Sequence, residues 1–335
     1  MNRSLAITGA VTGCLLALRL VQPTALQATP RAAPGQGAEV ARASNDATLK
    51  VVLLGTGVGP PVNLEQFGAS TLVEAGGKRL LFDCGRGATI RLTQAGIPSS
   101  SVSRVFLTHL HSDHIVQLPD LLLTAWVGPG AGAPGRTVPL QVWGPDGTRD
   151  MMSALEKAFA FDIHIRRDRD EKFSAEGIRV ESHDIKEGMV FDEDGVKVTA
   201  FLVDHGPVVP AFGYRVDYRG RSVALSGDTR FSENLIRHAE GVDVLIHEAY
   251  DAVAVRARSR NLTVTEAVIA HHTTPDQAGQ VFARVKPRLA VYSHAPATQS
   301  VIDQTRKIYS GPLEGAEDLL TIEIGEQVVV RHFGR

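Results

Sequence analysis

Residues 108–114 read Thr108-His109-Leu110-His111-Ser112-Asp113-His114, which places three imidazoles and one carboxylate within six residues. An apolar run, Val105-Phe106-Leu107, precedes this stretch, and a segment with helical spacing follows it from Ile115 to Leu123. In an extended chain His109 and His111 point to the same face, whereas Asp113 and His114 lie beyond the turn. The pattern favours two metal ions side by side over a surface loop that happens to be rich in histidine.

The composition is that of an ordinary globular protein. The 335 residues are 43% hydrophobic and 21% charged, with a formal net charge of −2. This length accommodates one large domain or two fused halves. The near-neutral balance offers no basic excess to neutralise phosphates, so we expect nucleic acid not to be the main partner, with a local basic patch left open. The two cysteines, Cys14 and Cys84, do not make a disulfide framework.

The first 28 residues have the pattern of a secretory signal peptide. An apolar stretch from Leu5 to Leu20 follows a positive residue, and small residues up to Ala28 provide a cleavage site. The stretch is too short for a membrane span, and Cys14 leaves open a lipoprotein cleavage box. We therefore expect an exported protein, periplasmic or secreted, that keeps no stable membrane span after processing.

The remainder divides into a leader and a folded domain. Residues 29–48 are rich in Ala, Pro, Gly and Ser, which predicts a flexible leader. Residues 49–335 alternate short apolar runs with helical segments, and two similar halves that divide near residue 185 would explain this alternation. Two facing sheets with helices outside would fit. Helices are predicted at residues 148–159, 233–239, 275–285 and 299–309, hairpins around 75–78 and 192–195 and over 319–331, and a charged surface excursion at 165–177.

A glycine-rich loop, Gly55-Thr56-Gly57-Val58-Gly59-Pro60-Pro61, follows a predicted strand from Lys50 to Leu54. Such a loop after a strand suggests a dinucleotide site. Pro60 and Pro61 argue against it, because they stop the helix whose N-terminus would hold the phosphates. We therefore interpret the segment as a tight loop at the mouth of a site.

Three further candidate ligands each follow an apolar run. His205 comes after Phe201-Leu202-Val203-Asp204, Asp228 shortly after Val223-Ala224-Leu225, and His294 after Tyr292-Ser293. Loops at the carboxyl ends of strands converge in α/β folds. We therefore expect these residues to meet the His-rich stretch in one site.

Eight ordered motifs give the chain a resemblance to the metallo-β-lactamase superfamily, in its ribonuclease Z-like and arylsulfatase-like branch. They cover essentially everything after residue 49. The resemblance implies a four-layer αβ/βα sandwich, an α/β architecture of two facing mixed sheets with helices outside. The motifs are LLGTG at 53–57, FDCGRG at 82–87, THLHSDH at 108–114, DHGPVVPAFGY at 204–214, SGDTR at 226–230, IHEA at 246–249, HTTPDQA at 272–278 and YSHAP at 292–296.

The resemblance also implies a binuclear zinc centre with seven protein ligands. Asp228 would bridge the two ions together with a water or hydroxide, and Asp113 would serve catalysis as well as binding. Imidazole and carboxylate are suitable zinc ligands, and manganese or iron suits the same set. One ion would be held by His109, His111 and His205, and the other by Asp113, His114 and His294.

A second implied feature is a general acid. By resemblance to ribonuclease Z, Glu248 would orient His272, which would protonate the leaving oxygen. His271 lies next to His272, and the choice between them rests on the HTTPDQA motif; a helix-capping neighbour without a catalytic role is the alternative for His272. Two more residues are candidate substrate contacts, Arg230 and His183, for which a structural ion pair and a plain surface histidine are the alternatives.

The chain departs from the tRNA-processing members of this branch. Those members carry a long arm that grips tRNA between the equivalents of His205 and Asp228, and here that interval is only 23 residues, enough for one hairpin. The missing arm, the near-neutral charge and the export signal together favour a small anionic ester. We therefore expect an exported zinc-dependent hydrolase of a sulfate ester or phosphodiester that uses a metal-bound hydroxide. The alternatives are a ribonuclease Z-type tRNA 3′-processing endoribonuclease and a non-catalytic metal-binding scaffold; a homodimer is left open.

Overall fold

Two β-sheets build the centre of the folded domain. The computed structural model describes residues 49–130 and 133–334, so the predicted signal peptide and leader lie outside the described residues. Strands β3, β4, β5 and β6 of the first sheet are parallel neighbours, and the others pair antiparallel. Its eight described strands lie in the order β15 (Val328–Arg331), β14 (Thr321–Ile324), β1 (Leu49–Gly55), β2 (Ser70–Ala75), β3 (Lys78–Phe82), β4 (Arg104–Phe106), β5 (Leu140–Gly144) and β6 (Val180–Asp184).

The second sheet contains the strands of the other half of the chain. Strands β10 to β13 are parallel neighbours, whereas β7, β8, β9 and β10 pair antiparallel. Its seven described strands lie in the order β13 (Leu313–Glu314), β12 (Leu289–Tyr292), β11 (Val244–His247), β10 (Arg221–Leu225), β9 (Val208–Tyr218), β8 (Val196–His205) and β7 (Gly188–Glu193).

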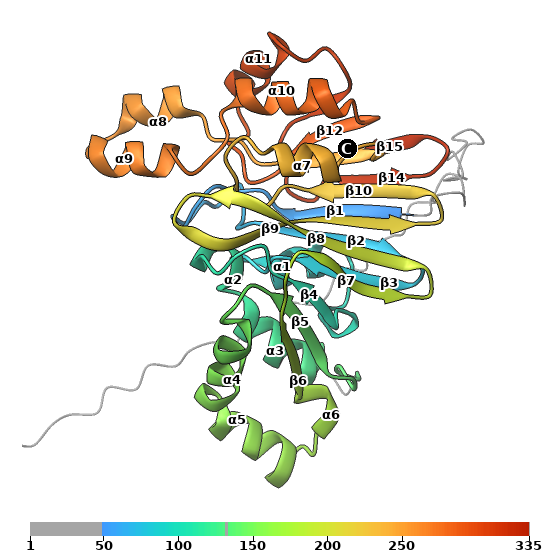
Figure 1. Cartoon of the computed structure of the whole chain (residues 1–335). Helices are drawn as coiled ribbons and strands as arrows, with labels where there is room; N and C mark the ends of the chain where they lie inside the picture. The colour runs from blue at the N-terminus through green and yellow to red at the C-terminus, as the bar shows by residue number, and fades with distance from the viewer. Residues whose placement is uncertain (1–48, 131–132, 335) are drawn as a thin grey trace, which may run out of the picture. The chain divides into compact units, whose positions relative to one another are not determined.

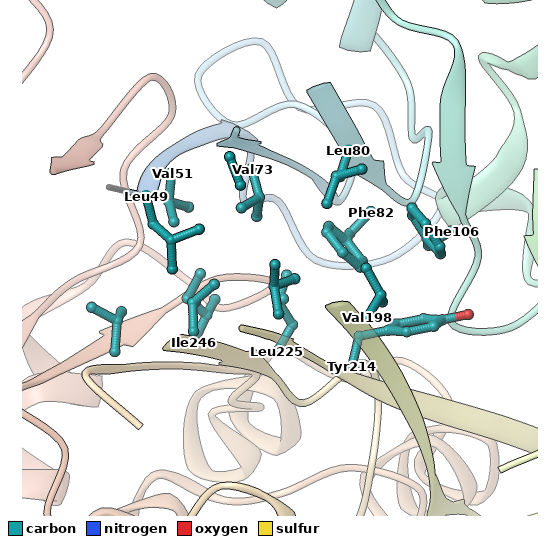
Figure 2. Packing of buried hydrophobic residues seen from close by; sticks show 14 of the residues in the cluster. Leu49, Val51, Val73, Leu80, Phe82, Phe106, Val198, Tyr214, Leu225 and Ile246 are labelled. Atoms are coloured by element: carbon teal, nitrogen blue, oxygen red, sulfur yellow. The ribbon is translucent and has the colours of Figure 1, made fainter. Parts of the chain in front are cut away.

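A continuous apolar core fills the space between the two sheets. Figure 2 shows side chains from both sheets meeting there, among them Phe82 and Phe106 from the first sheet and Leu225 and Ile246 from the second. The ring of Phe106 stacks on that of Phe82 at 5.1 Å and on that of Trp143 at 4.7 Å. This inner layer holds the two sheets together through apolar burial.

The central strands of the first sheet are buried on both faces, because helices cover the outer one. Leu49, Val51 and Leu53 of β1 belong to the core between the sheets, whereas Val52 and Leu54 pack beneath the helices. This alternation follows from the twofold period of a strand. The helices of this layer are α1 (Ala88–Gln94), α3 (Leu118–Val127), α4 (Thr148–Ala158) and α5 (Ala160–His164), with the short elements η1 (Ser99–Ser101), α2 (Ser112–Ile115), η2 (Ile165–Arg169) and α6 (Ala175–Ile178).

A second helical layer covers the outer face of the second sheet. Phe282 and Leu235 pack there against strand residues such as Leu245 and Tyr292. The two sheets and the two helical layers make an α/β sandwich of four layers (Figure 1). The fold that the resemblance implied is thus confirmed. The helices of this layer are α7 (Glu233–His238), α10 (Pro275–Val285) and α11 (Gln299–Arg306), and α8 (Ala252–Arg258) and α9 (Leu262–Ile269) form a separate hairpin.

The predicted division near residue 185 falls between β6 and β7, where the chain leaves the first sheet for the second. The C-terminal hairpin β14–β15 does not follow this division, because β14 pairs with β1 in the first sheet. The charged residues 165–177 are not simply irregular, since they include η2 and α6. Across residues 49–130 and 133–334 we find no helix with the length and apolar character that a membrane span needs.

Candidate metal centre

The His-rich stretch 108–114 connects the end of β4 to α2. His109, Asp113 and His114 are buried, whereas His111 is exposed. Helix α2 begins at Ser112, directly after the extended backbone of His111 (φ −65°, ψ 146°). The change from extended to helical backbone therefore separates His109 and His111 from the Asp113–His114 pair.

The three other candidate ligands stand at strand ends of the second sheet, and they converge on this stretch. His205 is the last residue of β8, while Asp228 and His294 follow β10 and β12. A Cβ at Gly227 would lie 2.5 Å from the carbonyl oxygen of Phe212, and the φ angle there is +59°. Glycine is therefore required for the turn that presents Asp228.

One group of ligand atoms comes from His109, His111 and His205. One nitrogen of each ring lies within 4.8 Å of the others. Nε2 of His205 is 3.3 Å from Nδ1 of His111, so the two rings direct their nitrogens at the same point. Three imidazole nitrogens converging in this way suit a zinc ion that keeps an open position.

A second group comes from Asp113, His114 and His294. Its ligand atoms also lie within 4.8 Å of one another, and all three side chains are buried. Nε2 of His294 is 3.3 Å from Oδ2 of Asp113. The structure thus assembles the two triads that the family resemblance implied.

Asp228 lies between the two groups. Its Oδ2 is 3.3 Å from Nε2 of His114 and 3.8 Å from Nε2 of His109, and its Oδ1 is 3.6 Å from Nδ1 of His294. Each oxygen therefore faces histidines of the proposed centre. This position suits a carboxylate that bridges two ions.

Asp83 orients the ligand rings and was not among the candidate site residues expected from the sequence. Nδ1 of His114 donates to Oδ2 of Asp83 at 2.7 Å. The hydroxyl of Thr108 also donates to Oδ2 of Asp83 at 2.8 Å. The same hydroxyl oxygen lies 3.0 Å from Nδ1 of His109 and accepts its hydrogen bond. Such partners fix the tautomer and orientation of ligand histidines. The available signal was the position of Asp83 just after a strand, within the FDCGRG motif.

The third buried imidazole is oriented by the main chain. Nδ1 of His205 donates to the carbonyl oxygen of His271 at 3.0 Å. In His109, His114 and His205 the Nδ1 atom is thus occupied, which leaves Nε2 of each ring for the centre.

The electrostatics of His109, His205 and Asp228 favour the ligand forms of these side chains. Burial lowers the pKa of His109 well below its ordinary value and that of His205 to about 4, so both imidazoles are neutral. Burial also lowers the pKa of His114, but Asp228 and Asp83 outweigh it and raise that pKa well above its ordinary value. Burial raises the pKa of Asp228, but His294 and His114 outweigh it and hold that pKa well below its usual range. Neutral imidazoles and a carboxylate are the forms that bind a cation.

Several buried atoms at this point have no hydrogen-bond partner among the described residues. They are Nε2 of His109 and His114, Oδ1 of Asp228 and Nδ1 of His294. Buried polar atoms are rarely left unpaired, because the desolvation penalty is large. Four such atoms around one point fit a site for metal ions.

His272 lies beside the metal centre and pairs with a buried glutamate. Its Nδ1 is 3.0 Å from Oε1 of Glu248, which also accepts the backbone N–H of Thr229 at 2.8 Å. Burial lowers the pKa of His272, but the Glu248 carboxylate overrides this effect and raises the pKa to about 9. His272 is therefore protonated at neutral pH, as a general acid must be.

The structure distinguishes between the neighbouring histidines 271 and 272. One ligand atom from each of His272, Glu248 and His294 lies within 4.8 Å of the other two. His271 instead accepts a hydrogen bond from Nδ1 of His205 through its carbonyl oxygen. The ring of Tyr250, which the sequence analysis missed, stacks on His272 at 5.1 Å and 17°. Tyr250 lies two residues after Glu248, and this proximity was the only available signal.

A cavity of about 430 Å³ opens onto the two triads and His272. The glycine-rich loop supplies Val58, Pro60 and Pro61 to its wall, and Tyr250 and Val268 line it as well. The loop thus lies at the mouth of the site, as predicted from its two prolines. The cavity combines an apolar wall with a floor of ligand atoms, as small-molecule and polymer sites commonly do.

The two candidate substrate contacts do not line this cavity. Arg230 donates from Nε to the carbonyl oxygen of Ala270 and pairs with Asp204 at 3.4 Å. His183 lies on β6 and stacks on Trp143 at 5.3 Å. Arg230 thus has the structural ion pair that was its alternative, whereas His183 is half-buried against Trp143 and is not a plain surface histidine.

The fold and the two groups of candidate ligands are those of the metallo-β-lactamase type. A family profile described as beta-lactamase superfamily domain matches residues 78–295. YhfI from Bacillus subtilis, a metallo-beta-lactamase fold protein, has a TM-score of 0.64 at 18% identity, over 82% of this chain and 98% of its own. The short form of human tRNase Z gives 0.59 at 22% identity, over 82% and 99% of the two chains.

Sequence relatives specify the family further. A ribonuclease Z from Mycobacterium sp. (strain KMS) is 37% identical over 295 residues, which cover 85% of this chain and 100% of the relative. The ribonuclease Z of Mycobacterium marinum is 36% identical, over 82% of this chain and 99% of the relative. The chain therefore belongs to the beta-lactamase superfamily and, within it, to the ribonuclease Z family.

These relatives correct one expectation. We expected nucleic acid not to be a main partner, and relatives that are named ribonucleases show that this expectation is wrong. The physical reason is that net charge averages over the whole surface. A total of −2 does not describe the charge next to one cavity.

Proposed function

We propose that the protein is a metal-dependent phosphodiesterase of the ribonuclease Z type, which cleaves a phosphodiester bond of RNA. The observation that carries this proposal is the placement of Asp228 between two ligand triads, with the Glu248–His272 pair in the same cavity. The similarity to ribonuclease Z over the whole length of the relatives supports the choice of RNA over a sulfate ester.

Two zinc ions would be held by the seven proposed ligands, one by each triad, with Asp228 shared. When bound, such ions act as Lewis acids and activate water for attack on phosphorus. The four unpartnered buried atoms and the neutral imidazoles support this fit. Manganese or iron suits the same donors.

The chain itself supplies the proton for the leaving oxygen. Because Nδ1 of His272 is bonded to Glu248, Nε2 of the ring is free to donate toward a substrate in the cavity. The Glu248 carboxylate keeps the imidazole protonated before the bond breaks and stabilises its orientation. His272 is thus the proposed general acid and Glu248 its positioning residue.

The missing arm does not argue against this function. The 22 residues between His205 and Asp228 form the end of the β8–β9 hairpin and β10. The mycobacterial relative is 37% identical to this chain over 295 residues, and the match covers 100% of its length. This similarity over the whole length of a protein named ribonuclease Z supports the proposed function in spite of the short interval.

The test is an assay of the zinc-loaded protein on precursor tRNA, bis-p-nitrophenyl phosphate and p-nitrophenyl sulfate. We expect cleavage of the RNA and of the model phosphodiester, lost after chelation and restored by zinc. Cleavage of the sulfate ester alone would contradict the proposed ribonuclease function and favour an arylsulfatase-like function instead. Stoichiometric zinc binding without turnover of any substrate would favour the scaffold reading.

We also propose that the protein is exported, from the pattern of residues 1–28. An activity in the periplasm or outside the cell would then meet extracytoplasmic RNA. Mass analysis of the mature N-terminus tests this proposal, and retention of Met1 in the mature protein would contradict it.

A further inference from the structure

Helices α8 and α9 form a hairpin that stands apart from both sheets. Figure 1 shows this pair, in orange, projecting beyond the strand ends. Helix α9 buries none of its side chains and α8 buries only Ala252. The hairpin therefore contributes little to the core of the domain, and its presence calls for another role.

Contacts within the hairpin keep its two helices together. Arg256 forms a two-pronged ion pair with Glu266, at 2.6 and 2.8 Å. The hydroxyls of Ser259 and Thr265 are 2.6 Å apart across the turn. Asp251 caps the start of α8 and also accepts the hydroxyl of Ser300 at 3.0 Å. The hairpin is thus an organised projection that is anchored at its base.

The base of the hairpin belongs to the catalytic cavity. The chain enters through Tyr250 and leaves through His271, and both residues line the cavity together with Val268 of α9. Each helix has seven or eight residues. At a rise of about 1.5 Å per residue the tip lies roughly 10 Å from the base. A stacked nucleic-acid strand rises about 3.4 Å per nucleotide, so the tip reaches about three nucleotides from the cavity.

Two arginines at the tip are free to bind a ligand. Arg258 and Arg260 are exposed, and neither guanidinium has an ion pair or hydrogen bond within the part of the chain that the structure describes. Arg256, by contrast, is neutralised by Glu266. The tip therefore carries two unpaired positive charges.

We propose that the α8–α9 hairpin is a docking arm for the RNA substrate, with Arg258 and Arg260 binding backbone phosphates of the strand that leads to the cavity. This inference rests on the proposed ribonuclease function. Guanidinium groups pair with phosphate oxygens in two-pronged geometry, and phosphate contacts position a nucleic acid without reading its sequence.

The experiment compares the double variant Arg258→Ala/Arg260→Ala with the wild-type protein, both zinc-loaded, on precursor tRNA and on bis-p-nitrophenyl phosphate. We expect KM for the RNA to rise roughly tenfold. The slope of the logarithm of the binding constant against the logarithm of the salt concentration should become less steep by about one unit per arginine. Turnover of the small phosphodiester, which does not reach the tip, should stay unchanged.

The control is the double variant Lys157→Ala/Arg169→Ala. It removes the same two charges from α4 and η2, where both side chains are exposed and neither lines the cavity. Its RNA kinetics should equal those of the wild type. If both double variants changed the RNA kinetics equally, the loss of net positive charge would explain the result, and the proposed docking arm would be wrong.

The outcomes separate this inference from the proposed function. If the wild type cleaves RNA and the arginine variant has unchanged KM and salt slope, the docking arm is wrong and the function stands. The exposed Val253, Leu262 and Val264 would then indicate a protein partner. If the wild type cleaves only bis-p-nitrophenyl phosphate and does not bind RNA, the proposed function fails as well.

Discussion

Oε1 of Glu248 lies 3.0 Å from Nδ1 of His272, and this contact joins the end of β11 to the segment after the α8–α9 hairpin. The same oxygen accepts the backbone N–H of Thr229, next to Asp228. The hydroxyl of Thr273 donates to the carbonyl oxygen of Thr229 at 2.6 Å. The proposed acid and the proposed bridging ligand are therefore positioned by one hydrogen-bonded unit.

His272→Ala should lower kcat on RNA by about 100- to 10,000-fold, the usual contribution of general acid catalysis. The loss on bis-p-nitrophenyl phosphate should be much smaller, because its nitrophenolate leaving group departs without a proton. Metal content should not change, which atomic absorption can verify. Equal losses on both substrates would instead point to a metal or folding defect.

Glu248→Gln should move the alkaline limb of the pH–rate profile to lower pH. The carboxylate raises the pKa of His272, so the acid form persists at higher pH in the wild type. Without this charge, burial of the ring lowers its pKa and the acid form is lost earlier as the pH rises. A profile identical to that of the wild type would contradict the coupling of the two residues.

Asp83→Asn should weaken zinc binding by about 10- to 100-fold, as expected for residues that orient ligand histidines. The carboxylate accepts from both Thr108 and His114, and the neutral amide cannot hold both in the same tautomer. Competition with a chromophoric chelator measures the affinity. The control is Asp243→Asn, a buried aspartate bonded to Ser222 and Arg288, which should affect stability but not zinc affinity.

Chelation should lower the Tm of the protein measured by calorimetry. Metal bound only by the native state stabilises it, by about 4 kcal/mol at a free concentration 1,000 times the Kd. In Asp228→Ala the shared ligand is missing, so the chelator should shift the Tm much less. A Tm of the wild type that does not respond to chelator would contradict the binuclear centre.

Phe106→Ala should destabilise the domain by about 3–5 kcal/mol in urea denaturation, because it opens a cavity between the sheets. Phe106 is completely buried between Phe82 and Trp143. Phe161→Ala is the control, since this ring is 81% exposed and its loss should cost less than about 0.5 kcal/mol. Equal effects of the two substitutions would contradict the packing described for the core.

Local signals predicted those parts of the fold that depend on neighbouring residues. The helix expected at residues 275–285 has those bounds, because Thr274 and Gln277 form a capping box at its start. The α8–α9 hairpin was not predicted, since its helices are short and have no buried apolar face that would impose a periodic pattern. The C-terminal hairpin was predicted, but its pairing with β1 is a long-range contact that no local pattern encodes.

The candidate site was predictable where the ligands stand within one motif or at strand ends. His109, His111, Asp113 and His114 are close in sequence, so their chemistry is visible before folding. Asp83 and Tyr250 were missed because an aspartate and a tyrosine have no specific meaning without their spatial neighbours. The expectation against nucleic acid failed for a related reason, since the total charge does not describe how charge is distributed over the surface.

The sequence by itself determined which atoms can bind metal and the order in which strands deliver them, because ligand chemistry and strand alternation are local properties. The family resemblance implied that Asp228 bridges two triads and that Glu248 orients His272, and only the tertiary structure decided the distances that bring these side chains together. It also decided that Arg258 and Arg260 are free while Arg256 is paired. These relations depend on distances across two sheets and a hairpin, and only the packing of the whole domain determines such distances.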